Sequence, residues 1–228
     1  MKLDKLIRML ITPLVLQLEK FPKLKHFFWV YLSQKKEFRF HKKDNWRRTQ
    51  DFLKQNDFLF KHWGFNEFDY ENKVIIDIGA GSKLRSKYFR GSKIIAIEPL
   101  ADKFVKKIDF CDLREAYKIY SLPAENMIEE LKGIADLIIC INVLDHVDNY
   151  QKVLNAAYFY LKNDGRFLLS VDLHETATIE HSVSLDEGKL ESHFVKSNIR
   201  VLRKIKSLPN SAFYGQGETV TYILIWNE

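Results

Sequence analysis

Short runs of apolar residues alternate with amphipathic stretches from residue 74 to residue 172. A run that is apolar at nearly every position is typical of a strand buried on both faces, and three- and four-residue apolar spacing is typical of a helix. The runs predict strands at 74–78, 93–98, 118–121, 136–142 and 166–172. The stretches between them predict helices at 83–89, 101–107, 125–131 and 149–161. Such alternation implies right-handed crossovers and a doubly wound parallel sheet.

The pattern changes on both sides of this region. A polar loop to about Ser184 precedes a predicted helix near 185–197 and strands at 200–208 and 219–226. A closing hairpin fits the last two strands better than a crossover, so at least one of them should be antiparallel. Residues 2–63 have a mostly helical pattern. We therefore expect a seven-stranded, mostly parallel α/β domain at 71–228, preceded by an N-terminal helical extension at 1–70.

The composition agrees with one hydrophobic core, since 46% of the 228 residues are hydrophobic. Cys111 and Cys140 show no pairing pattern, so we expect two reduced, structural cysteines and no disulfide scaffold or thiolate metal site. The longest uncharged stretch near the start, 9–18, contains Pro13 and is too short to span a bilayer. No cleavage site for a signal peptide follows it, so we expect a cytoplasmic location without a transmembrane segment.

Polar residues gather where the predicted strands end, which is where an open α/β sheet binds its ligand. Asp77 and the Gly79-Ala-Gly81 turn end the first strand, and the two glycines let the backbone approach a ligand closely. Glu98 ends the second strand, where an acid can accept hydrogen bonds from two ribose hydroxyls. The dinucleotide fingerprint needs another glycine where Leu84 stands, and no phosphate-binding loop is present. These residues predict a nucleotide-like ligand without a pyrophosphate.

These residues resemble the motifs of the class I S-adenosylmethionine-dependent methyltransferases, in their small-molecule branch, over roughly residues 70–228. The stretches that carry the resemblance are 77–81, 95–100, 122–125, 136–146 and 161–169. One departure is Lys162-Asn-Asp164, where many relatives have Lys-Pro-Gly, and it alters a turn and not a ligand contact.

The resemblance implies a Rossmann-like methyltransferase fold, S-adenosylmethionine as the methyl donor and S-adenosylhomocysteine as the product. Glu98 would bind the ribose, Leu100 would face the adenine, and Glu125 or a backbone group beside it would meet the adenine amine. The residues that it places at the cofactor are Asp77, Gly79, Ala80, Gly81, Glu98, Pro99, Leu100, Ala124, Glu125, Asn142 and Val143. For Leu100 and Asn142, simple core or turn packing is the competing interpretation.

Methyl transfer needs a base if the acceptor is a hydroxyl or a protonated amine, and histidine is best matched to neutral pH. His146 follows the fourth predicted strand, and His174 and His181 follow the fifth. His174 and His181 are the leading candidates, and His146 is either a base or a support for one. A metal site built from Asp172, His174 and His181 is a weak alternative, so we expect no metal.

The acceptor is best predicted as a small, anionic molecule, for example one that is phosphorylated or nucleotide-linked, or one from a surface-glycan pathway. The loop after Asn142 lacks the Pro-Pro-aromatic motif of enzymes that methylate exocyclic amines of nucleic acids. The net charge of +6 arises within residues 1–72, which hold 15 Lys and Arg against 9 Asp and Glu. An anionic acceptor is attracted by such a charge.

The basic, aromatic segment Lys20–Arg48 leaves other interpretations open. It could follow an RNA backbone, as in an RNA methyltransferase, or lie on anionic lipid as a peripheral membrane contact. The interpretation that we favour is a helical lid that packs over the cofactor cleft while its lysines stay solvated. A methyltransferase fold that has lost catalysis and only binds is a third alternative, disfavoured because Asp77, Gly79, Gly81 and Glu98 are all present.

Overall fold

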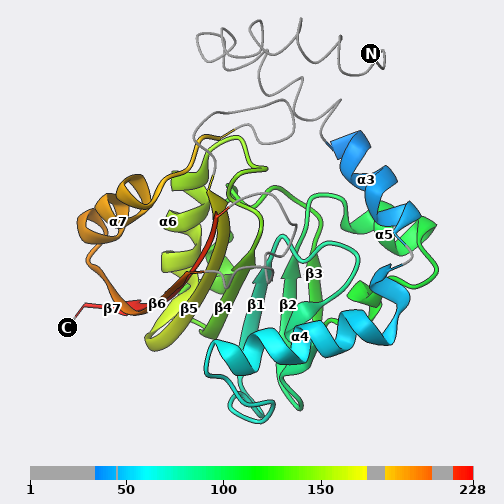
Figure 1. Ribbon diagram of the computed structural model, residues 1–228, viewed down its shortest axis with the longest axis horizontal. Coiled ribbons are helices and arrows are strands. Elements are labelled where there is room, and N and C mark those ends of the chain that lie inside the picture. The colour runs from blue at the N-terminus through cyan, green and yellow to red at the C-terminus, as the bar shows by residue number, and fades with distance from the viewer. Residues whose placement is uncertain (1–33, 45, 174–182, 207–217, 228) are drawn as a thin grey trace, which may run out of the picture.

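The computed structural model describes residues 34–44, 46–173, 183–206 and 218–227 (Figure 1). The predicted bases His174 and His181 lie outside these residues, as do residues 1–33 of the predicted N-terminal extension.

A single seven-stranded sheet organises the fold, in the order β3-β2-β1-β4-β5-β7-β6. The first five strands are parallel, and β7 lies antiparallel between β5 and β6, which confirms the predicted fold class. The strands are β1 Val74–Ile78, β2 Lys93–Ile97, β3 Lys118–Tyr120, β4 Ala135–Ile141, β5 Leu161–Leu173, β6 Ile199–Lys206 and β7 Glu218–Trp226. Strand order reverses between β1 and β4, so the carboxyl ends of these two strands flank the expected ligand position.

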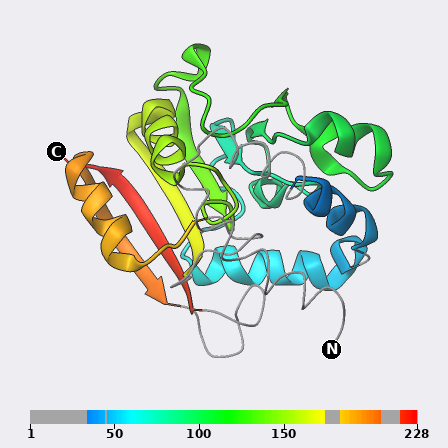
Figure 2. The same ribbon diagram turned by 90° about the horizontal axis from the view of Figure 1, so that it is seen from above.

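Helices cover both faces of the sheet, and Figure 2 shows α4 and α6 on opposite sides of it. The described helices are α3 Gln34–Lys43, α4 Gln50–His62, α5 Ala101–Lys107, α6 Tyr150–Tyr160 and α7 Glu187–Lys196. Alternate residues of one strand point to opposite faces, so Ile76 packs in the core beneath α6 and Ile75 in the core beneath α4. Burial on both faces explains why the parallel strands are continuously apolar.

Two of the predicted crossover helices are wrong. At 83–89 and 125–131 the chain forms only short 3-10 helices, Arg85–Tyr88 and Glu129–Leu131. The face that a crossover helix after β1 would cover is instead covered by α4, whose Phe60 is fully buried in the same cluster as Ile75. An earlier segment of the chain therefore supplies the layer that the crossover does not.

Strand β5 also differs from its prediction, because it begins at Leu161 and not at Arg166. Ala135 of β4 pairs with Leu161 and Leu137 pairs with Arg166, so the intervening turn residues form an irregularity inside the strand pair. A Cβ on Gly165 would lie 2.7 Å from the carbonyl oxygen of Ala135, which shows how closely the two backbones approach. Residues Asn163-Asp-Gly165 therefore form a bulge within β5.

Both cysteines are buried and free. None of the helices within the described ranges is long and apolar enough to cross a membrane. In the same ranges, no three His, Cys, Asp or Glu side chains are grouped so that they could bind a metal ion.

Candidate active site

Two glycines shape the turn that leaves β1. Gly79 has φ 68° and Gly81 has φ 62°, which is the left-handed region that favours glycine. A Cβ on Gly79 would lie 2.3 Å from Cγ2 of Val143, and one on Gly81 would lie 2.6 Å from Cε1 of His41. Both positions therefore require glycine for conformation and for space, and half-buried Ala80 lies between them.

Asp77 holds the loop that follows this turn. Its carboxylate oxygen Oδ2 accepts a hydrogen bond from the hydroxyl of Ser86 at 2.6 Å and from the backbone N–H of Ser86 at 3.4 Å. Burial raises the pKa of Asp77 to about 6, although the bonds from Ser86 and the charge of Arg85 oppose the shift. Asp77 thus holds Ser86, and with it the loop after the glycine turn, from inside the protein.

Glu98 joins the glycine turn to the end of β2. Its Oε2 accepts from the backbone N–H of Gly81 at 3.0 Å, and its Oε1 accepts from the N–H of Leu100 at 2.9 Å. Burial raises the pKa of this carboxyl to about 7. Each carboxylate oxygen can accept a further hydrogen bond, which leaves capacity for two ribose hydroxyls. Pro99 is half-buried, and Leu100 is buried in the apolar cluster around α5.

Asn142 and Val143 close the other side, directly after β4. Asn142 has φ 55°, and its side-chain Oδ1 is buried with no hydrogen-bond partner among the described residues. A buried acceptor without a partner is costly, and this oxygen could accept a hydrogen bond from a ligand at this edge of the sheet. Val143 is buried against Gly79.

Glu125 and Ala124 lie after β3. Oε1 of Glu125 accepts from the backbone N–H of Asp148 at 2.8 Å and of Asn149 at 3.3 Å, so this carboxylate ties the loop to the residues that precede α6. Ala124 is buried beside it. The roles predicted for these two residues at the adenine remain predictions.

His146 is the one predicted base that falls within the described residues. It follows β4, its side chain is one-third exposed, and its Nε2 lies 3.5 Å from Oδ2 of fully buried Asp145. A histidine with one nitrogen near a buried carboxylate and part of its surface exposed has the environment of a general base.

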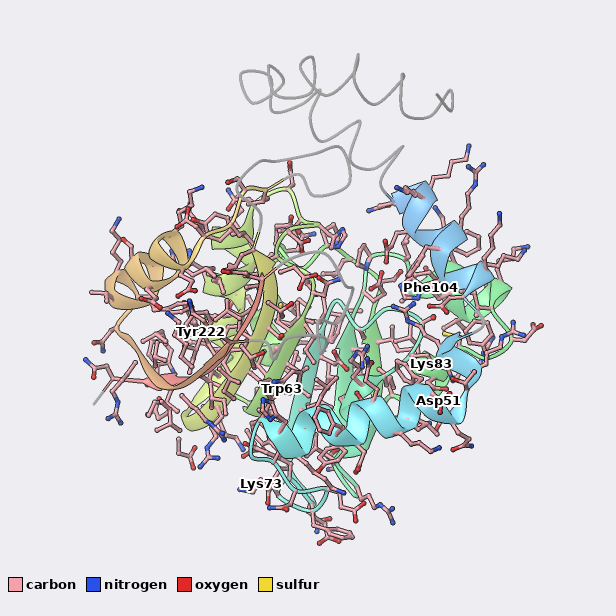
Figure 3. The ribbon with its side chains drawn as sticks, in the orientation of Figure 1. Asp51, Trp63, Lys73, Lys83, Phe104 and Tyr222 are labelled. Carbon is pink, nitrogen blue, oxygen red and sulfur yellow. The ribbon has the colours of Figure 1, made fainter. Side chains whose placement is uncertain are left out.

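Helix α3 contributes a side chain that the sequence analysis missed. His41 is buried, with Nδ1 2.8 Å from the hydroxyl oxygen of Ser82 and Nε2 3.0 Å from Oε1 of Glu37. Its ring packs 4.7 Å from that of Phe104, which Figure 3 places where α3 meets α5. The signal that could have revealed it is the four-residue spacing of Glu37 and His41 in a helix otherwise rich in lysine.

Residues 46–208, more than half of the chain, match a family model described as a methyltransferase domain. The chain belongs to this methyltransferase family. This match confirms that the chain is a methyltransferase by family, as the sequence motifs predicted.

Curated relatives of this methyltransferase carry one activity in their names. The ubiquinone biosynthesis O-methyltransferases of Pseudomonas paraeruginosa and Pseudomonas aeruginosa are 27% and 28% identical to it over 133 residues. The aligned part covers 55% of this chain and 56% of each relative, so the chain spans about half the length of the curated relatives it matches.

Solved structures share the fold of the methyltransferase at lower identity. A Burkholderia thailandensis 1,6-didemethyltoxoflavin-N1-methyltransferase, with bound 1,6-didemethyltoxoflavin and S-adenosylhomocysteine, is 17% identical with a TM-score of 0.55, covering 81% of this chain and 82% of its own. A Haemonchus contortus N-methyltransferase in complex with phosphomonomethylethanolamine and S-adenosylhomocysteine is 12% identical with a TM-score of 0.59, covering 77% and 53%.

The site residues of the methyltransferase fit S-adenosylmethionine, the methyl donor that the sequence motifs imply. The glycine turn leaves room where a Cβ would intrude, Glu98 presents a buried carboxylate, and Asn142 presents a buried oxygen with no partner in the described part of the chain. These three features stand at the carboxyl ends of β1, β2 and β4.

Proposed function

We propose that this methyltransferase moves the methyl group of S-adenosylmethionine to a hydroxyl oxygen of a small, anionic acceptor. The observation that carries the proposal is the buried Glu98 carboxylate, held by the N–H groups of Gly81 and Leu100 at the strand ends where a nucleoside would bind. An amine nitrogen or a phosphate oxygen is the competing acceptor atom.

The protein's contribution to the reaction is mainly position. When bound, the cofactor supplies a methyl carbon on a positively charged sulfur, which is open to in-line attack. Glu98 accepts hydrogen bonds from the ribose, the glycine turn lets the backbone lie close to the ligand, and Oδ1 of Asn142 accepts a further hydrogen bond. Holding two reactants in line removes much of the entropic barrier of a bimolecular step.

His146 removes the proton of the acceptor hydroxyl as its oxygen attacks. Nε2 of His146 lies 3.5 Å from Oδ2 of Asp145, a buried carboxylate. The buried carboxylate then stabilises the imidazolium that forms. The names of the curated relatives, which are O-methyltransferases, support oxygen as the acceptor atom.

The charge of helix α3 supports an anionic acceptor. This helix reaches the glycine turn through His41, while five of its basic residues are exposed: Lys35, Lys36, Arg39, Lys42 and Lys43. Cations beside the mouth of a cleft raise the local concentration of anions. The Haemonchus contortus structure, which holds a phosphorylated small molecule on a similar fold, is compatible with this class of acceptor.

Titration calorimetry with S-adenosylhomocysteine tests the cofactor part of the proposal. We expect micromolar binding to the wild-type protein and a loss of about tenfold or more for Glu98→Ala, because a charge-assisted hydrogen-bond acceptor is removed. Equal affinity of Glu98→Ala and wild type would contradict the ribose role of Glu98.

A transfer assay with radiolabelled S-adenosylmethionine tests the acceptor. Phosphorylated and nucleotide-linked hydroxy compounds are compared with their uncharged analogues, with amines and with bulk RNA. We expect methylation of hydroxyls, with charged compounds preferred. Methylation of RNA, with binding that weakens steeply with salt, would favour the RNA alternative. Cofactor binding without any transfer to the panel would favour a binding module.

A further inference from the structure

A chain of hydrogen bonds runs from helix α3 to the carboxylate of Glu98. Glu37 bonds to Nε2 of His41, and Nδ1 of His41 bonds to the hydroxyl and the backbone N–H of Ser82. The preceding N–H, that of Gly81, donates to Glu98. A helix outside the sheet and the end of β2 are therefore connected through two successive peptide units of the glycine turn, which meet at the Cα of Gly81.

The direction of these hydrogen bonds defines the state of His41. The backbone N–H of Ser82 can only donate, so Nδ1 of His41 accepts from it at 3.3 Å. Nε2 then carries the proton and donates to the carboxylate of Glu37 at 3.0 Å. Burial lowers the pKa of His41, and the bond to Glu37 opposes that shift.

Packing holds the imidazole ring as firmly as its hydrogen bonds do. One edge lies against Gly81, where a Cβ would come within 2.6 Å of Cε1. Phe104, fully buried on α5, lies 4.7 Å from the ring of His41, and Phe38 of α3 stacks on Phe104 at 6.1 Å. Figure 1 shows α3 beside α5 at this corner of the molecule. The ring is thus confined between the turn and a buried aromatic side chain.

We infer that His41 is a positioning residue of the cofactor site, which holds the N–H of Ser82 and so fixes the backbone at Gly81, and that the N–H of Gly81, in the preceding peptide, thereby stays directed at Glu98. Glu37 in turn holds His41 in the tautomer that accepts from Ser82. The inference rests on the proposed role of Glu98 at the ribose. Packing of helix α3 against the glycine turn and binding of the cofactor are therefore coupled, and each favours the other.

Calorimetric titration of the full chain with S-adenosylhomocysteine tests the role of His41. His41→Leu keeps apolar packing on Phe104 but removes the acceptor, and we expect it to weaken binding about tenfold. His41→Asn offers Oδ1 in place of Nδ1 and should stay within about threefold of wild type. The matched control is His62→Leu on α4, which alters a half-buried histidine that is stacked on Phe58, and this variant should bind as wild type does.

Hydrogen exchange supplies a second readout that does not depend on turnover. Bound S-adenosylhomocysteine should slow exchange of the backbone amides at 37–43 in wild type and His41→Asn, and less so in His41→Leu. If His41→Leu fails to fold, Glu37→Ala and Ser82→Ala decide the matter, because each removes one bond of the chain and should weaken binding severalfold.

The outcomes separate this inference from the proposed function. Wild-type protein that does not bind S-adenosylhomocysteine, or Glu98→Ala that binds normally, would overturn the proposed role of Glu98 itself. A second outcome would overturn the inference about His41 alone. In it, Glu98→Ala loses affinity for S-adenosylhomocysteine as expected, but His41→Leu keeps the affinity and the amide exchange of wild type. Wild-type behaviour of both Glu37→Ala and Ser82→Ala would have the same meaning.

Discussion

Two pairs of carboxylates lie in different surroundings. Asp77 and Glu98 stand at the carboxyl ends of β1 and β2, and both are buried. Glu187 and Glu191 stand on α7, beside the β6 edge of the sheet, and both are partly exposed. The first pair accepts hydrogen bonds from backbone and hydroxyl groups, and burial raises the pKa of each. The second pair forms ion pairs with Lys204, and Glu187 also pairs with Lys206. Hydrogen bonds to both lysines hold the pKa of Glu187 below its usual value.

The difference teaches what each set of carboxylates does. Burying a charge that is not fully compensated costs stability, and such groups cluster where a ligand supplies the remaining partner. Exposed ion pairs are screened by water and salt and contribute little. Substitutions at the two edges of the sheet should therefore differ in size and in kind.

The largest effect is expected from Gly79→Ala. Its new methyl group would overlap Val143 at a left-handed φ, so we expect no measurable binding of S-adenosylhomocysteine and a free energy of unfolding lower by about 2 kcal/mol or more. Calorimetry and urea unfolding measure the two changes. Gly133→Ala is the control, since Gly133 has φ 60° but nothing within 4 Å of an added Cβ. It should lose about 1 kcal/mol and bind normally.

A loss of catalysis without a loss of binding is expected from His146→Asn. Removing a general base typically slows the chemical step by about a hundredfold, while the affinity for S-adenosylhomocysteine should be unchanged. Steady-state kinetics on the best acceptor of the panel, alongside calorimetry, separate kcat from cofactor binding. Wild-type kcat in this variant would show that His146 is not the base.

A pH dependence is expected from the first pair of carboxylates. Because their pKa values are raised in the folded state, their contribution to the free energy of unfolding is full below about pH 4 and is lost as the pH rises through about 6 and 7. Ribose hydroxyls favour ionised Glu98, so cofactor affinity should change in the opposite direction. We expect it to rise about tenfold between about pH 6 and 8.

Glu98→Gln provides the matched control for this titration. Glutamine keeps the shape of the side chain and one acceptor oxygen but does not ionise. The rise of affinity with pH should flatten in this variant, and a slope equal to that of wild type would assign the titration to another group.

The smallest effect is expected at the β6 edge of the sheet. Lys204→Ala removes the cation shared by Glu187 and Glu191, at a side chain that is one-third exposed. We expect the free energy of unfolding to fall by less than about 1 kcal/mol, and less at high salt, with unchanged cofactor affinity. A larger loss of unfolding free energy would contradict the difference that we expect between the buried carboxylates and the exposed ion pairs.

The strands and the edge that holds the site could be predicted because each depends on local patterns. Ile75 and Ile76 are both buried, on opposite faces, and this produces the continuous apolar run that predicts a parallel strand. Asp77 and Glu98 then stand at strand ends regardless of the structure that the connecting segments adopt. The contacts within the site follow from the same strand register, Asp77 lying opposite Ala96, next to the end of β2.

The remaining features depend on contacts between distant segments. Residues 83–89 have helical spacing, but the bonds from Ser86 to Asp77 and the packing of α4 leave room for only a 3-10 turn. The bulge in β5 is decided by the closeness of Gly165 to Ala135. The contact of His41 with Ser82 spans 41 residues, and nothing in the local sequence of either residue specifies it.

The place of α4 in the structure has a consequence for the order in which the chain can fold. Phe60 of α4 packs in one cluster with Ile75, Leu168 and Ile223. Helix α4 is synthesised before every strand, but part of the surface against which it packs lies on β7, the last strand. Contacts between such distant residues make folding slow and leave apolar surface exposed meanwhile. A fragment of residues 71–228 would expose that surface permanently, and we expect it to aggregate where the full chain stays in solution.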